Sequence, residues 1–149
     1  MGWFTEERIV RITTWLLRFS GIVICCALVP VFFPVEVMNR IHQSLGLGEL
    51  PTEPIVVYMA RSLSAMYFAH GVVVCFVSGN VRRYWPFVRL LGTLNIVLGL
   101  IFLGTDWLVP MPLPWTLTEG PPIIGFGVIL LWLDGLKKHC SSDARDAAV

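Results

Sequence analysis

Four polar side chains lie inside long apolar stretches of this chain and are its best candidates for chemistry. They are Arg18, Arg61, His70 and Asn95. An ionisable side chain inside hydrocarbon costs about 2.5–3.5 kcal/mol on insertion scales, so each such residue needs a polar partner or a ligand. The chemistry open to them is anion recognition by a guanidinium, proton transfer by the imidazole, and hydrogen bonding by the amide.

Arg61 lies roughly 10 Å of helix below the start of its apolar stretch. One interpretation is a structural ion pair, or an arginine whose side chain extends to the headgroups and sets the depth of its helix. The other is a site for an anion or carboxylate, with Tyr58 and either Ser62 or Ser64 as additional donors. The acidic residues predicted near the same membrane face are Asp106, Glu119, Glu36 and Glu53.

His70 and Asn95 lie at matching positions in consecutive apolar stretches. If the two stretches form antiparallel helices, both residues lie at one depth, roughly 13 Å from the nearer boundary. We expect a hydrogen bond between them. It either holds the helices together, at about 0.6 kcal/mol, or belongs to a proton relay or a polar layer that binds a ligand. The candidate ligand-binding residues are Arg61, Ser64, His70, Asn95, Asp106 and Glu119.

The sequence contains no motif for catalysis, for a metal ion or for a cofactor. It has no phosphate-binding glycine loop followed by lysine, no HExxH and no Gly-x-Ser-x-Gly. Cys25 and Cys26 are adjacent rather than at zinc-ligand spacing, and the three histidines are predicted at different depths. We therefore expect no catalytic residue, no metal and no cofactor, and we rank an enzyme third, behind two non-enzymatic functions.

The elements that must position these residues are membrane spans. The chain is 56% hydrophobic and 14% charged, with a mean hydropathy of +0.74, and its polar residues cluster between long apolar runs. This pattern predicts an all-α integral membrane four-helix bundle in one domain. The predicted spans are 12–33, 55–78, 87–105 and 119–136, with a short interfacial helix at 35–45 and a polar C-terminal tail at 137–149.

The first span has an alternative interpretation as a cleavable signal peptide, with Cys25-Cys26-Ala27 as a loose cleavage site. We favour a retained helix because the apolar run continues to Phe33. Small residues mark the faces on which helices approach closely in lipid. They are Gly21 and Cys25 on the first span, Ala60, Ser64, Tyr67 and Gly71 on the second, and Gly92, Asn95 and Gly99 on the third.

The distribution of positive charge predicts the topology, because cytoplasmic loops retain lysine and arginine. Arg40 is the one basic residue of the two predicted outer loops. We therefore expect a multi-pass protein of the cell inner membrane with both termini in the cytoplasm, and spans two and three as an antiparallel hairpin. A net charge of +1 favours no nucleic acid partner. The basic residues on the predicted inner side are Arg8, Arg11, Arg82, Arg83, Arg89, Lys137, Lys138 and Arg145.

The layout of four spans, an amphipathic segment after the first and a loop rich in proline and tryptophan before the last resembles the DoxX-like group and related uncharacterised small bacterial membrane proteins. Some members of that group are associated with redox partners, so the resemblance implies an accessory-subunit role. We expect a non-enzymatic accessory or scaffold subunit that contacts the lipid bilayer and either a membrane-protein partner or a second copy of itself. The alternative is a small binder or transporter of an anionic or lipid-like ligand.

Overall fold

The structure is a computed structural model that describes residues 5–146, with side chains to Ser142. Every regular element in this range is a helix, as the composition predicts. Four helical segments are long and apolar enough to cross a membrane: Glu6–Val31, Pro54–Gly79, Trp85–Leu108 and Leu113–Ser142. The chain is therefore built as a multi-pass membrane protein. Its helices are α1 (Glu6–Cys25), α2 (Leu28–Val31), α3 (Val35–Ser44), α4 (Pro54–Gly79), α5 (Trp85–Leu108) and α6 (Leu113–Asp146).

The first spanning segment consists of α1 and α2, separated by a break at Cys26 and Ala27. Thr5 caps α1, because its side chain accepts a hydrogen bond from the Arg8 amide at 3.3 Å. Pro30 has no amide hydrogen to donate to the Cys26 carbonyl, which instead accepts from Val29 at 3.0 Å. The helix therefore tightens and bends at this point.

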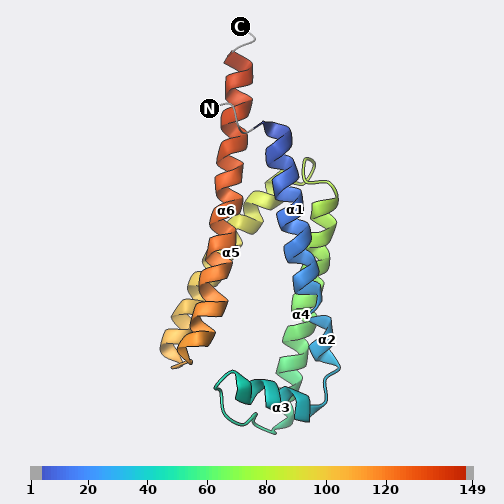
Figure 1. The fold of residues 1–149 in the computed structure, drawn as a ribbon, viewed down its shortest axis with the longest axis vertical. Coiled ribbons are helices and arrows are strands. Elements are labelled where there is room, and N and C mark those ends of the chain that lie inside the picture. Colours follow the sequence, from blue (N-terminus) through green and yellow to red (C-terminus); the bar gives the residue numbers. More distant parts are fainter. Residues whose placement is uncertain (1–4, 147–149) are drawn as a thin grey trace.

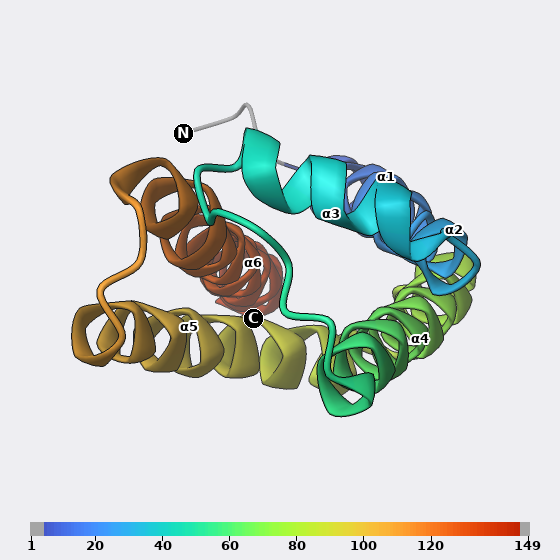
Figure 2. The same cartoon turned by 90° about the horizontal axis from the view of Figure 1, so that it is seen from below.

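Helix α3 lies across the far end of the spans rather than along them (Figure 1). Its C-terminus leads into Gly46 and Gly48, whose φ angles of 76° and 80° are left-handed conformations that glycine adopts without strain. The segment that follows is tied back to α3, since Asn39 Oδ1 accepts a hydrogen bond from the Leu50 amide at 2.7 Å. Seen from below, α3 bridges from α2 toward the start of α6 (Figure 2).

The spanning helices form two separate pairs, α1 with α4 and α5 with α6. The predicted hairpin of spans two and three is wrong, because α4 and α5 share no extended contact after the turn that joins them. Figure 1 shows the two pairs close together at one end and apart at the other. We call the closed end, where α1 begins and α6 ends, the basic end, and the other the α3 end.

Pairs of glycines explain this pairing. A Cβ atom on Gly71 would lie 2.8 Å from the Cys25 amide nitrogen, and one on Gly127 would lie 2.6 Å from the Gly92 carbonyl oxygen. These distances are shorter than van der Waals contact, so only glycine permits the observed approach of the backbones. Gly21 on α1 packs on α4, and Gly99 and Gly120 pack on one another between α5 and α6.

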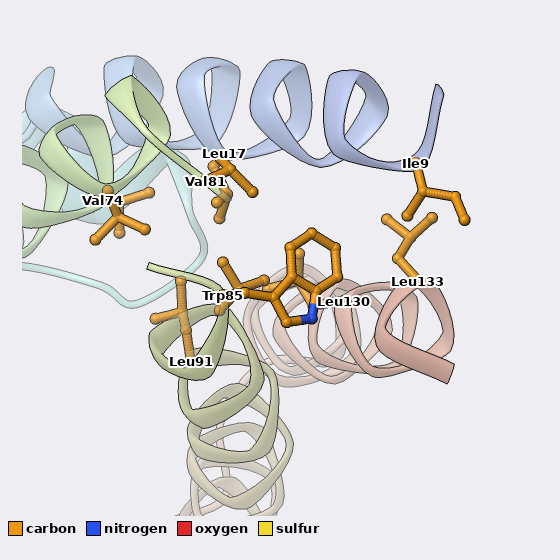
Figure 3. Packing of buried hydrophobic residues seen from close by; sticks show 10 residues of the cluster. Ile9, Leu17, Val74, Val81, Trp85, Leu91, Leu130 and Leu133 are labelled. Atoms are coloured by element: carbon orange, nitrogen blue, oxygen red, sulfur yellow. The ribbon is translucent and has the colours of Figure 1, made fainter. Parts of the chain in front are cut away.

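The buried apolar core lies at the basic end, where it joins the two pairs. Figure 3 shows the Trp85 indole between α1 and α6, with Leu130 and Leu133 beside it. Because ten buried apolar residues from all four spans and from the turn between α4 and α5 meet here, this end of the molecule is closed. They are Ile9, Leu17, Val74, Val77, Val81, Trp85, Val88, Leu91, Leu130 and Leu133.

Helix α6 is longer than predicted at both ends. It begins at Leu113, so Pro121 and Pro122 lie inside the helix rather than in its first turn. Neither proline can donate to the carbonyl four residues earlier, at Leu117 and Thr118, and two main-chain hydrogen bonds are lost. The segment predicted as a polar tail from Lys137 continues α6 to Asp146, and residues 147–149 lie outside those that the structure describes.

Candidate functional site

A cavity of about 320 Å³ lies between the two helix pairs, and we call it the central cleft. All four spans contribute to its walls. Three of its ten lining residues are polar, and none of the ten is lysine, arginine or a carboxylic acid. The lining residues are Ser20, Val23, Ile24, His70, Val74, Leu91, Asn95, Pro122, Ile123 and Phe126.

His70 and Asn95 face the same cleft, although no hydrogen bond joins them. The Asn95 side-chain nitrogen donates to the Leu91 carbonyl of its own helix at 2.8 Å. The Ser20 hydroxyl is likewise turned back, donating to the Leu17 carbonyl at 3.1 Å. The His70 ring has no hydrogen-bond partner within the described part of the chain. The cleft therefore offers an imidazole and the Asn95 carbonyl oxygen to a ligand.

The predicted hydrogen bond between His70 and Asn95 is absent for a physical reason. It requires α4 and α5 to pack side by side, whereas each of them packs on a different neighbour. The two residues lie on opposite walls of an opening instead of across a helix contact. Arg18, another of the four polar candidates, is exposed and does not line the cleft.

Arg61 belongs to a different cavity. It is nine residues from His70, about two and a half helical turns, which places the two side chains on opposite sides of α4. Arg61 lines a groove of about 610 Å³ with Tyr58 and Ser62, whereas Ser64 is not among the residues that line it. Arg61 and His70 therefore do not share one cavity.

The predicted acidic partners of Arg61 lie elsewhere. Arg61 donates to the Phe33 carbonyl oxygen at 3.2 Å and forms no ion pair with any carboxylate among the described side chains. Glu119 accepts a hydrogen bond from the Trp115 indole at 2.8 Å. Asp106 is 8% exposed, and its Oδ2 atom has no partner among the described residues. Both acids belong to the α5–α6 pair, which diverges from α4 toward the α3 end.

The best-satisfied polar cluster, centred on Asp134, was missed by the sequence analysis. Asp134 is 4% exposed and accepts a hydrogen bond from the Trp85 indole at 2.7 Å. Arg89 donates to both carboxylate oxygens, from Nε at 2.9 Å and from Nη2 at 3.0 Å. Lys138 Nζ lies 2.9 Å from Oδ2. Both oxygens are fully engaged, so this carboxylate locks α5 to α6 and is not free to bind a ligand.

A second layer of contacts extends this lock to α1. The Lys137 ammonium lies 4.3 Å from the centre of the Trp85 ring and 3.8 Å from a carboxylate oxygen of Glu6. Arg82 lies 3.9 Å from Glu7. The sequence contains one indication of the Asp134 cluster, which is the spacing of Asp134 and Lys138, four residues apart at the end of an apolar span.

Comparison with models of protein families, with curated proteins and with solved structures finds no match to this chain. The resemblance of its layout to the DoxX-like group stays a prediction.

Proposed function

We propose that this protein binds a lipid-like molecule in the central cleft. The observation that carries the proposal is a mainly apolar cavity, lined by all four spans, in which the His70 ring has no hydrogen-bond partner among the described side chains and main chain. A polar group without a partner inside hydrocarbon is costly, and a ligand with one polar group would remove that cost. The volume of about 320 Å³ lies at the lower end of the range for ligand pockets.

The lining determines the chemistry of this ligand. An apolar chain or ring fits against Val23, Ile123 and Phe126, and a hydroxyl or carbonyl group reaches His70 and the Asn95 oxygen. Because the cleft contains no lysine or arginine, a neutral polar group suits it better than an anion. This favours the lipid-like form of the ligand over the anionic one.

The direction of access follows from the shape of the molecule. The buried core and the Asp134 cluster close the basic end, whereas the pairs diverge toward the α3 end. This arrangement supports binding from the side between α4 and α5 rather than passage through the bundle. The bias of lysine and arginine supports a cytoplasmic basic end, with both termini inside and the α3 end at the outer face of a cell inner membrane.

Photo-crosslinking with a matched pair of variants tests the proposal. The protein is reconstituted in phosphatidylcholine nanodiscs that contain a lipid with a diazirine on its acyl chain, and the adducts are mapped by peptide mass spectrometry. We expect adducts at Ile123 and Phe126 in the native chain. Val23→Trp fills the cleft and should remove them, whereas Ile22→Trp should leave them unchanged, because Ile22 has a similar exposure, 56% against 53%, outside the cleft.

Two results would contradict lipid binding in the cleft. One is the absence of adducts at Ile123 and Phe126 while exposed positions such as Phe19 are labelled. The other is retention of these adducts in both tryptophan variants, which would mean that the adducts report bulk lipid rather than a filled cleft.

A second proposed function is a non-enzymatic accessory or scaffold subunit, supported by the open side between α4 and α5. A transmembrane helix of a partner, or of a second copy, would pack in this opening. Photoreactive residues at Leu63 and Leu98, which the helical period places on the opening side, should then crosslink to one defined membrane protein, and Phe76 should not. Equal crosslinking at all three positions would contradict this role.

A further inference from the structure

The groove beside Arg61 is a second candidate binding site, separate from the central cleft. It lies between α2 and α4, with Val31 on one wall and Val57, Tyr58 and Ala65 on the other. Its volume of about 610 Å³ is nearly twice that of the cleft. Because it opens on the opposite side of α4, it faces lipid rather than the space between the helix pairs.

No carboxylate among the described side chains neutralises the charge of Arg61. Its Nη2 atom donates to the Phe33 carbonyl, which uses one of the five donors of a guanidinium. Glu49 and Glu53, the acids nearest to it in the sequence, form no ion pair with it, and neither does Glu36. Arg61 lines a groove whose other walls are mainly apolar, and its remaining donors have no partner among the described side chains.

Arg61 lies at a depth from which its guanidinium can reach the headgroup region of a leaflet. It lies seven residues after Pro54, roughly 10 Å along α4 from its first turn at the α3 end. An extended arginine side chain reaches from that depth to the phosphate level of a membrane. The Ser62 and Tyr58 hydroxyls, from the same stretch of α4, are further donors for the oxygens of a phosphate.

We propose that this groove binds an anionic phospholipid from the leaflet at the α3 end. The phosphate pairs with the Arg61 guanidinium, and the upper part of an acyl chain lies on Val31, Val57 and Ala65. A planar guanidinium matches two phosphate oxygens at once, and an anionic headgroup supplies the missing negative charge. The site does not depend on the central cleft, so either proposal can fail without the other.

Lipid retention in native mass spectrometry tests the site. The full chain is released from micelles that hold equal amounts of phosphatidylglycerol and phosphatidylcholine, and the ratio of the two bound lipids is measured. Arg61→Gln keeps a donor for the Phe33 carbonyl but removes the charge, so the ratio should fall about tenfold, the worth of one charge-assisted hydrogen bond. Arg40→Gln removes an exposed charge on α3 outside the groove, and the ratio should not change.

Two further measurements in the same experiment identify the ligand. Ala65→Trp fills the groove while Arg61 stays in place, so it should also abolish the preference for phosphatidylglycerol. Inorganic phosphate added to the native chain should displace little phosphatidylglycerol, because the acyl contacts are missing. Any one of three results would overturn the proposal. The ratio of the two lipids could be the same for Arg61→Gln and Arg40→Gln, Ala65→Trp could keep the preference for phosphatidylglycerol, or inorganic phosphate could displace all of the bound phosphatidylglycerol.

Discussion

Polar side chains within the spans differ in whether the fold supplies partners for their hydrogen bonds and charges. Asp134 has both oxygens engaged by Trp85, Arg89 and Lys138, as expected of a structural group. Arg61 uses one donor on a backbone carbonyl, and His70 has no hydrogen-bond partner among the groups that the structure describes. Both residues keep hydrogen-bonding groups that lack a partner in the fold. For this reason one proposed ligand is assigned to Arg61 and the other to His70.

Replacing Asp134 should measure the strength of the lock at the basic end. Asp134→Asn leaves Arg89 and Lys138 without their counter-charge, and we expect it to lower the free energy of unfolding by about 2 kcal/mol. The value is below that of a fully buried pair because the Arg89 side chain is 49% exposed and water compensates part of the loss. Unfolding by sodium dodecyl sulfate, followed by tryptophan fluorescence, gives the measurement.

The matched control is Glu7→Gln, which breaks the exposed contact with Arg82. We expect a change of less than about 1 kcal/mol there, since exposed ion pairs contribute little. Equal effects of the two substitutions would show that the Asp134 cluster does not hold the helices together.

The sequence identified two of the three polar residues of the cleft but not the Asp134 cluster. Their positions within apolar stretches singled out His70 and Asn95, and both do face the cleft. Asp134 was overlooked because it lies close to Lys137 and Lys138 in the sequence, and such a group of charges resembles the ordinary boundary of a membrane span. Its bond to Arg89, 45 residues earlier, becomes visible only when α5 is known to pack on α6.

At the scale of the helices, contacts between glycines determine which helix packs on which. Gly21, Gly71, Gly92 and Gly99, all on predicted contact faces, do lie at helix contacts. The sequence marked these faces but did not show which two meet. The position of α6 was harder to predict, because Pro121 and Pro122 suggested a first turn and instead lie in the helix interior.

Alanine substitutions at glycines with different surroundings should separate packing from helix propensity. Gly71→Ala places a methyl group against the backbone of α1, so we expect it to lower the free energy of unfolding by about 1–3 kcal/mol. Gly104→Ala meets no atom within 4 Å and should stabilise its helix by about 0.5–1 kcal/mol. The same detergent unfolding assay reports both. A tolerated Gly71→Ala would contradict the close approach of α1 and α4.

At the scale of the whole molecule, two helix pairs meet at the basic end and diverge toward α3. Hydropathy and charge predicted the number of spans and that α1 begins where α6 ends, because both are local properties of the chain. The short turn at residues 80–84 suggested that α4 and α5 pack together. A short connection, however, only places the end of one helix near the start of the next. The wedge shape results from packing between distant segments.

Electron-spin distance measurements on the reconstituted protein test this wedge most directly. Spin labels at Met59 and Thr105 probe α4 and α5 near the α3 end, and labels at Val73 and Phe87 probe the same faces near the basic end, in a chain whose four cysteines are replaced by serine. We expect a clearly longer distance between Met59 and Thr105 than between Val73 and Phe87. Equal distances would show two parallel neighbouring helices, with no opening for a ligand between them.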